Sequence, residues 1–142
     1  MLKGIPSVLT PELLKILAEM GHGDELVIGD SNFPAQSKGK RCIRADGHSG
    51  TEMLDAILKL FPLDTFVDTP VGLMAADPGT IDSPYPPIWD EYKAIVEKHQ
   101  PGTKCEEVNR FDFYDRTEKA YAAVSTGETQ PYGCIIIRKG CC

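Results

Sequence analysis

Apolar residues follow a helical period in three segments of the chain. In each segment, hydrophobic side chains recur every three or four residues and so share one helical face. This spacing predicts helices over residues 11–20, 50–61 and 88–99, and the segment FDFYDRTEKA suggests a further short helix over residues 111–120. The first two carry start signals, because Thr10 is a suitable N-cap ahead of Pro11 and the segment Ser49 to Glu52 forms a capping box.

Short apolar runs between these helices predict strands. The clearest run, Leu26 to Ile28, is unbroken, as expected of a strand covered on both faces. Similar runs predict strands at residues 25–29, 41–45, 71–76, 105–108, 121–126 and 134–139. Polar and proline-rich segments at 30–40 and 77–87 are expected to be loops. Alternation of strands and helices predicts an α/β layered fold, and we expect the last two strands to form an antiparallel edge.

Length and charge restrict the fold and the class of partner. The 142 residues suffice for one domain with a substantial core, so residues 1–142 are expected to form a single domain. The net charge of −6 and the lack of long Lys and Arg runs argue against nucleic acid or an anionic membrane as partner. Neither a signal peptide nor a membrane-spanning apolar segment is recognisable. A small neutral ligand fits this balance best.

Sequence motifs restrict the chemistry further. The five cysteines show no CxxC spacing and no paired histidines, so no zinc site is expected, and free thiols in the cytoplasm are the simplest interpretation. The chain also lacks GxGxxG, P-loop, GxSxG and HExxH motifs. Cofactor-dependent and phosphoryl-transfer chemistry are therefore disfavoured. Acid–base catalysis or simple binding remains.

The first candidate for chemistry is His22, in the segment EMGHGDELVIGD. A glycine on each side would permit positive φ angles and a close approach of a ligand. The alternative is a structural role: Gly21 would be the left-handed residue that ends the first helix, with the imidazole beside the helix carbonyls. The local pattern alone favours this second interpretation.

Asp30 is the second candidate, because it closes the predicted strand at 25–29. Ligands of open α/β sheets gather beyond the carboxyl ends of strands, although an aspartate is equally common as a turn residue. An extended strand would separate Asp30 from His22. The two can share a site only if a neighbouring element or a second subunit brings them together.

Two later segments carry weaker candidates. Arg110 could bind hydroxyl groups through its guanidinium group, or it could form a surface ion pair. Tyr132 and Gly133 could offer a phenol and an open backbone amide to a ligand, or they could pack as a simple turn. The residues alone leave these alternatives open.

Five segments of the chain form a specific combination. They are LKGIPSVLTPELLKILAEMGHGDELVIGDSNFPA, IRADG, PLDTFV, NRFDFY and TGETQPYGCIIIRKG. Taken together, they resemble the fucose mutarotase branch of the RbsD/FucU family. The resemblance follows the chain in order and covers nearly all of it, and it is weakest around residues 36–41 and 77–104. NRFDFY favours the fucose branch, because the sister ribose pyranase branch typically carries a His-Glu-Glu-Phe segment at this place.

The resemblance implies a three-layer α/β/α fold with a central mixed, mostly parallel sheet of about six strands. It implies a cofactor-free enzyme that interconverts the α and β anomers of L-fucose. It also implies a ring-like homo-oligomer, with a decamer as one candidate size and sites completed across subunit contacts. The alternatives are a ribose pyranase-type conversion between pyranose and furanose, and a non-catalytic sugar-binding accessory protein.

The resemblance also implies roles for individual residues. His22 matches the catalytic histidine of the family, and Asp30 and Arg110 match its substrate-binding aspartate and arginine. The segment Tyr132 to Cys134 matches a substrate-binding segment that usually reads Tyr-Gly-Asn. Cys134 thus replaces an amide side chain that could donate and accept hydrogen bonds. Asp30 and Tyr132 are both eligible as the second proton carrier.

Overall fold

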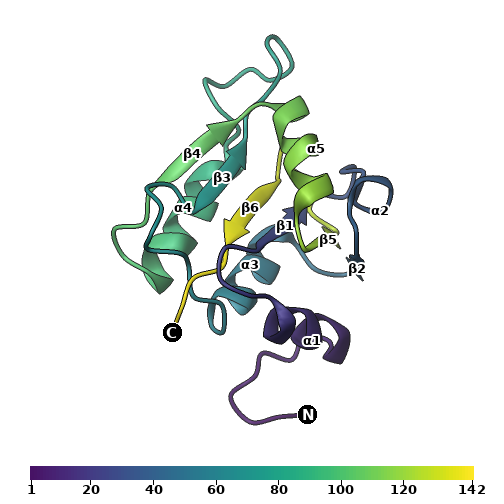
Figure 1. Cartoon of the computed structure of the whole chain (residues 1–142). Coiled ribbons are helices and arrows are strands. Elements are labelled where there is room, and N and C mark those ends of the chain that lie inside the picture. The colour runs from purple at the N-terminus through teal and green to yellow at the C-terminus, as the bar shows by residue number, and fades with distance from the viewer.

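The computed structural model describes residues 1–142 and contains five helices and six strands (Figure 1). In chain order they are α1 (Pro11–Glu19), β1 (Glu25–Gly29), α2 (Ala35–Lys38), β2 (Cys42–Ala45), α3 (Gly50–Leu58), β3 (Val71–Met74), α4 (Ile88–His99), β4 (Cys105–Val108), α5 (Arg110–Lys119), β5 (Ala122–Thr126) and β6 (Ile135–Arg138). No helix combines the length with the apolar character that crossing a bilayer requires.

The six strands form one mixed sheet in the order β2-β5-β1-β6-β3-β4. Strands β2, β5 and β1 run parallel to one another, and β3 runs parallel to β4. Strand β6 lies between β1 and β3 and is antiparallel to both. The predicted mixed, mostly parallel sheet of six strands is therefore confirmed.

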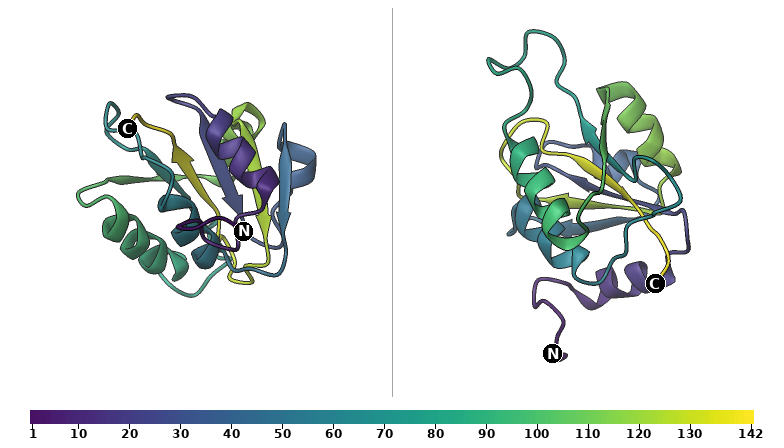
Figure 2. Two further views of the ribbon diagram at one scale, coloured as in Figure 1. Left: turned by 90° about the horizontal axis from the view of Figure 1, so that it is seen from below. Right: turned by 90° about the vertical axis from the view of Figure 1, so that its left-hand side faces the viewer.

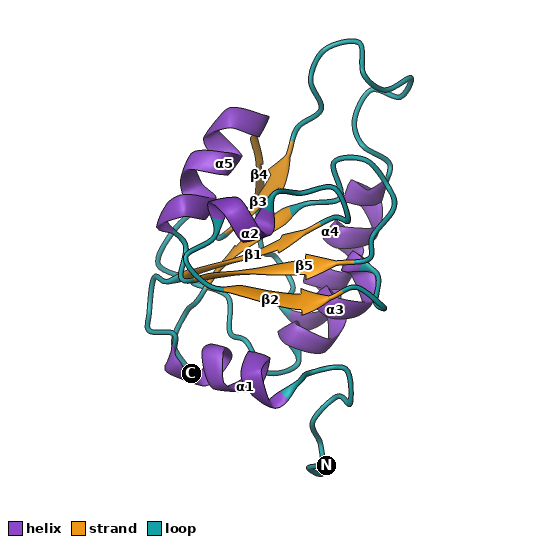
Figure 3. Ribbon diagram, turned by 90° about the vertical axis from the view of Figure 1, so that its right-hand side faces the viewer, coloured by secondary structure: helices purple, strands orange, loops and turns teal.

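Helices cover both faces of this sheet (Figures 2 and 3). Helices α1, α3 and α4 pack on the larger hydrophobic core, and α2 and α5 enclose a smaller core on the opposite face. Strand β1 shows how one sequence serves both cores, because successive side chains of a strand point to opposite faces. Leu26 and Ile28 belong to the larger core and Val27 to the smaller, and all three are fully buried. The three-layer α/β/α arrangement is confirmed.

The last two strands do not pair with each other, so the prediction of an antiparallel edge is wrong. Strand β5 lies between β2 and β1, and β6 lies between β1 and β3. The run Ile135 to Ile137 is fully buried. Three consecutive isoleucines need cover on both faces, which an interior strand provides and an edge strand with an open face does not. The connecting residues 127–134 pass over the end of β1 to reach this position.

Two local predictions also need correction. Helix α1 ends at Glu19, and the left-handed glycine after it is Gly23, with φ of 88°, whereas Gly21 is not in the left-handed region. The segment 30–40 is not wholly loop, because it contains the four-residue helix α2. A single helical turn is too short to show a hydrophobic period in the sequence.

The sheet directs two groups of loops to opposite ends of the molecule. At the end that we call the carboxyl end, strands β1, β3, β4 and β5 finish and β6 begins, with Ile28 paired to Ile135. At the opposite, amino end, β1 begins beside the end of β6, where the Gly23 amide donates to the Lys139 carbonyl at 2.8 Å. The C-terminus follows the end of β6 at the amino end, and the long loop between β3 and α4 projects from the opposite part of the molecule (Figures 1 and 3).

Candidate functional site

Four of the residues singled out in the sequence line one pocket at the carboxyl end of the sheet. They are Asp30, Arg110, Tyr132 and Cys134, and the pocket has a volume of about 310 Å³. The sheet explains this convergence, because Asp30 follows β1, Cys134 precedes β6, and Arg110 is the first residue of α5, directly after β4. The remaining lining residues are Asn32, Phe33, Met74, Thr80, Tyr114 and Pro131.

The Asp30 carboxylate is held by the backbone of two turns. Oδ1 accepts a hydrogen bond from the Asn32 amide at 3.0 Å, and Oδ2 accepts one from the Gly133 amide at 3.2 Å. The residue is largely buried. A carboxylate fixed in this way has its direction set before a ligand arrives, so it can accept a hydrogen bond from a ligand hydroxyl without reorganising.

Cys134 supports the same carboxylate. Its thiol lies 3.5 Å from Asp30 Oδ2, and its sulfur accepts a hydrogen bond from the Asp30 amide at 3.4 Å. Burial, and then the neighbouring negative charge of Asp30, raise the pKa of this thiol well above its ordinary value. The side chain is therefore a neutral thiol, which can donate to the carboxylate.

Arg110 is held at the pocket by an acidic partner and by aromatic rings. Its Nε donates to Asp77 Oδ2 at 2.7 Å, and its guanidinium carbon lies 4.5 Å from the ring centre of Phe111 and 5.6 Å from that of Tyr114. Tyr114 and then Asp77 raise the pKa of Arg110 above its ordinary value. The side chain is a charged donor whose direction the pocket fixes.

Tyr132 has a strained backbone. It is the one residue other than glycine with positive φ, at 58°, a conformation that costs about 1–2 kcal/mol for an L-residue. The next residue, Gly133, is held by the Tyr92 hydroxyl, which donates to its carbonyl at 2.8 Å. A Cβ on Gly133 would lie 2.9 Å from Glu128 Cγ, so only glycine fits there. The strained turn directs the Tyr132 hydroxyl to Thr80, 2.7 Å away.

His22 lies at the opposite end of the molecule from this pocket. It precedes β1, whereas Asp30 follows it, and five residues at about 3.3 Å each separate the two ends of that strand by about 16 Å. The Nε2 atom of His22 lies 3.1 Å from Asp64 Oδ1, and 40% of the side chain is exposed. Within one chain, His22 and the pocket do not meet.

The comparisons with known proteins agree along the whole chain. A profile of the RbsD / FucU transport protein family matches residues 3–142. The chain belongs to this family. It is 51% identical over 142 residues to the L-fucose mutarotase of Actinobacillus pleuropneumoniae (serotype 5b, strain L20), covering 99% of this chain and 96% of the relative. It is 50% identical over 143 residues to the fucose mutarotase of Danio rerio, covering 98% and 93%.

A solved structure of the RbsD/FucU family superposes closely on the chain. The crystal structure of the fucose mutarotase from Streptococcus pneumoniae in complex with L-fucose matches with a TM-score of 0.92 and 45% sequence identity, over 99% of both chains. The similarity includes the elements that build the pocket, since the matched region is nearly the complete chain.

Sequence reasoning did not identify three contributors to the site of this RbsD/FucU member. Asp77 and Thr80 lie in the loop between β3 and α4, where the family resemblance is weakest, and they contact Arg110 and Tyr132. Asp64 lies in the segment PLDTFV, which the sequence marks only as part of the family resemblance. No periodicity marks such residues, because their partners are distant in sequence.

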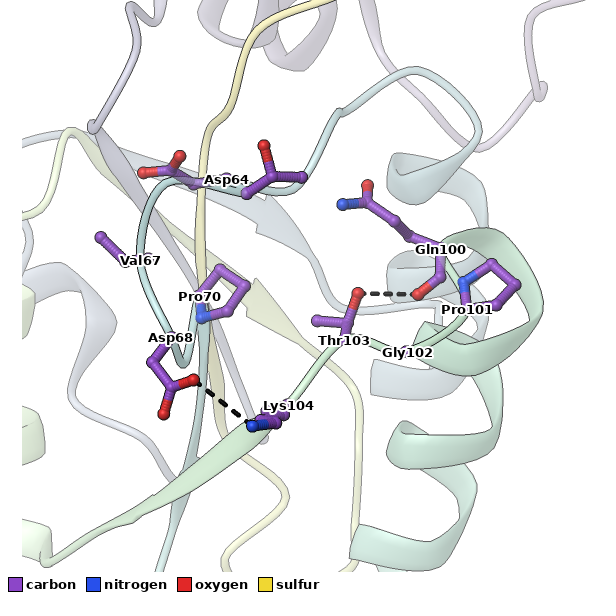
Figure 4. A pocket seen from close by; sticks show the side chains of 10 residues that line it. Asp64, Val67, Asp68, Pro70, Gln100, Pro101, Gly102, Thr103 and Lys104 are labelled. Atoms are coloured by element: carbon purple, nitrogen blue, oxygen red, sulfur yellow. Dashed lines mark hydrogen bonds and ion pairs between the residues drawn. The ribbon is translucent and has the colours of Figure 1, made fainter.

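A second hollow of about 310 Å³ lies near the amino end (Figure 4). It is lined largely by polar residues, among them Asp64, Gln100, Thr103 and the ion pair of Asp68 with Lys104, whose atoms are 3.5 Å apart. None of the sugar-binding candidates lies here. The Asp64 carboxylate is turned away from Gln100 and Thr103 in this view, toward the other side of its loop.

Proposed function

We propose that this chain is an L-fucose mutarotase, which interconverts the α and β anomers of L-fucopyranose by acid–base ring opening and closure without a cofactor. One observation carries the proposal: the chain superposes over 99% of its length on a fucose mutarotase that was crystallised with L-fucose. The pocket at the carboxyl end supports it, because polar groups of both donor and acceptor type surround a volume suited to a small neutral sugar.

The pocket residues suit the recognition of hydroxyl groups. The Asp30 carboxylate would accept hydrogen bonds from sugar hydroxyls, Arg110 would donate them, and the Tyr132 hydroxyl can do either. The Gly133 amide and the Cys134 thiol would act mainly by holding the Asp30 carboxylate, to which both are hydrogen-bonded. Apolar side chains such as Phe33 and Met74 would contact the sugar's carbon framework.

The reaction needs a base for the anomeric hydroxyl and an acid for the ring oxygen. An imidazole can serve in both directions, because it titrates near neutral pH. We infer that His22 is the principal proton-transfer group, with Asp30 or Tyr132 as the second. Positioned acid–base groups accelerate a step by about 10²–10⁴-fold, which is a sufficient contribution for a reaction that free sugars undergo in water.

His22 would reach the pocket from another copy of the chain. In the chain that carries His22, the pocket lies at the other end of β1. A shared site therefore requires the amino end of one copy to meet the carboxyl end of the next. Phe66 packs edge-on against the His22 ring, with ring centres 5.0 Å apart, and is 76% exposed, as an interface residue would be in the isolated chain. Each copy would be one domain in a ring-like homo-oligomer, with a decamer as a candidate size.

The location that we propose is the cytoplasm. All five cysteines are unpaired, and two of them, Cys141 and Cys142, are exposed. Exposed free thiols persist in a reducing compartment and become oxidised outside it.

Saturation-transfer NMR on L-fucose tests the activity, with D-ribose as the comparison sugar. The proposal predicts faster exchange between the L-fucose anomers on addition of the protein. Exchange of ribose alone would indicate a pyranase instead, and binding of sugar without faster exchange would indicate an accessory protein. The variant His22→Ala should stay folded and lose the acceleration. The control variant His48→Ala should keep it, because His48 lies just before the N-cap of α3 and not in the proposed site.

A further inference from the structure

We propose that Asp64 is a positioning residue that holds His22 in the tautomer protonated on Nε2, so that Nδ1 is the nitrogen that exchanges a proton with the sugar. The part of the inference that concerns proton exchange with the sugar rests on the proposed function. The tautomer of His22 does not, because it is a property of the folded chain. The observation that motivates it is the 3.1 Å contact of His22 Nε2 with Asp64 Oδ1.

Asp64 is a fixed hydrogen-bond acceptor. Its side chain is only 2% exposed. Oδ1 also accepts from the Phe66 amide at 2.9 Å, and Oδ2 accepts from Arg138 Nε at 2.9 Å. The Phe66 amide and then Arg138 and His22 lower the pKa of this carboxyl to about 2, against the opposing effect of burial. An ionised carboxylate can only accept, so His22 Nε2 must be the donor in the pair.

The fold places this pair accurately at the amino end. The Asp64 amide donates to the Arg138 carbonyl at 3.0 Å, which extends the sheet beside the end of β6. The Gly23 amide donates to the next carbonyl, that of Lys139. Both loops are therefore fastened to one strand. A Cβ on Gly23 would lie 3.1 Å from Arg138 Nη2, and its φ of 88° favours glycine as well, so the second glycine beside His22 serves this fastening.

The remaining nitrogen of His22 is available to a ligand. Nδ1 has no hydrogen-bond partner within the chain, whereas Nε2 has Asp64. Phe66 contacts the ring edge-on at an interplanar angle of 82° and offers no polar atom there. Figure 4 shows the Asp64 carboxylate turned away from Gln100 and Thr103, and on its other side Oδ1 contacts His22 Nε2 at 3.1 Å.

This arrangement gives each nitrogen one task during ring opening. The anomeric hydroxyl transfers its proton to Nδ1 as the bond from the anomeric carbon to the ring oxygen breaks. The electron pair of that bond passes to the ring oxygen, which takes a proton from the Tyr132 hydroxyl, because the Asp30 carboxylate accepts two backbone hydrogen bonds and has no proton to give. Asp64 then stabilises the imidazolium ion until Nδ1 returns its proton during ring closure. The carboxylate touches no substrate atom and acts through His22.

The other two histidines provide internal references. His99 Nε2 lies 2.7 Å from Asp55 Oδ1, and His48 bonds through its other nitrogen, with Nδ1 3.1 Å from Glu52 Oε2. A single chain thus contains two histidines paired through Nε2 and one paired through Nδ1. The variant Asp55→Asn is a matched control, because it alters a histidine–aspartate pair that shares no residue with the His22–Asp64 pair.

Two-bond ¹H–¹⁵N correlation spectra of the imidazole rings in the full chain test the inference. We expect neutral His22 to be protonated on Nε2, and we expect Asp64→Asn and Asp64→Ala to produce a mixture of tautomers. Asp55→Asn should leave the His22 signals unchanged. A wild-type His22 protonated on Nδ1 would overturn the inference, and so would folded Asp64 variants with an unchanged His22 tautomer. The wild-type spectrum decides the matter even if the variants do not fold.

Exchange kinetics provide the second measurement. We expect Asp64→Asn to lower the maximal rate of L-fucose exchange by about 10-fold or more, within the ~10²–10⁴-fold that acid–base groups supply, with the KM changed less than twofold. An unchanged rate, or a change in KM alone, would contradict the positioning role. If the wild-type protein does not accelerate exchange, the proposed function fails, while the spectra still report on the tautomer.

Discussion

Asp30 and Cys134 are hydrogen-bonded to each other in both directions at the carboxyl end of the sheet. The Asp30 amide donates to the Cys134 sulfur at 3.4 Å, and the thiol lies 3.5 Å from Asp30 Oδ2. A cysteine therefore supports this carboxylate, and keeps a donor beside it, at a position where the family resemblance implies an asparagine.

The Cys134 contact predicts a difference between two small substitutions. Cys134→Ala removes the thiol donor and leaves the carboxylate less well held, so the KM for L-fucose should rise about 3- to 10-fold, which corresponds to the loss of one hydrogen bond. Cys134→Ser keeps a donor and an acceptor and should stay near wild type. Exchange rates measured over a range of L-fucose concentrations check this. Equal KM values for the alanine and serine variants would argue against the supporting role.

Asp77 predicts an effect through Arg110. Asp77→Ala frees the guanidinium group from its 2.7 Å contact, so the group loses its fixed direction toward the pocket. The pair is about one-third exposed, and such pairs contribute at most about 1 kcal/mol. The KM for L-fucose should therefore rise by no more than about 5-fold, with little change in the folding free energy.

The matched control for this prediction is Asp68→Ala. It removes another aspartate ion pair, with Lys104, in the second hollow away from the pocket. This variant should leave both the KM and the maximal rate unchanged. Similar effects of the two substitutions would show that the Asp77 result reflects overall charge rather than the position of Arg110.

Asp64 predicts a loss of stability in acid. Its pKa is about 2 in the folded chain and 3.8 as the ordinary value. A carboxyl whose pKa is lowered by folding stabilises the folded state above its unfolded pKa, and this contribution disappears as the pH falls through the folded pKa. The free energy of unfolding of wild type relative to Asp64→Asn should therefore be constant above about pH 5 and decrease between pH 4 and pH 2.

Urea unfolding of both proteins across this pH range measures the difference. Other carboxyl groups titrate in both proteins, so subtracting the two curves isolates Asp64. A difference that is independent of pH down to 2 would contradict the lowered pKa.

Sequence pattern predicted what depends on local spacing. The helix start at Thr10 and the buried strand from Leu26 to Ile28 follow from capping and periodicity, and both are present. The position of β6 could not be predicted in this way, because strand order depends on contacts between distant segments. The isoleucine run indicated burial on both faces, and this signal should have ruled out an edge position.

Only those parts of the candidate site that have a local signal or a family motif could be predicted from the sequence. Asp30 is placed by its position at the end of a strand, and the family resemblance contributed the roles of Arg110 and of the Tyr132 turn. Asp77 and Asp64 were not predicted as contributors, since each acts on a residue more than thirty positions away. Such pairings are visible only in three dimensions.

The central claim is that the pocket of one copy works with His22 of another. Mixed oligomers of two inactive variants test it most directly. His22→Ala keeps the pocket and lacks the imidazole, and Asp30→Asn keeps the imidazole in a chain with a defective pocket. The two variants are unfolded and refolded together in equal amounts, and L-fucose anomer exchange is then measured by saturation transfer.

The account predicts that each variant refolded alone is nearly inactive, whereas the mixture regains about a quarter of the wild-type exchange rate. This is the share of contacts at which an intact pocket meets an intact histidine when subunits mix at random. A mixture that is no more active than the separate variants, although light scattering shows mixed oligomers, would contradict it.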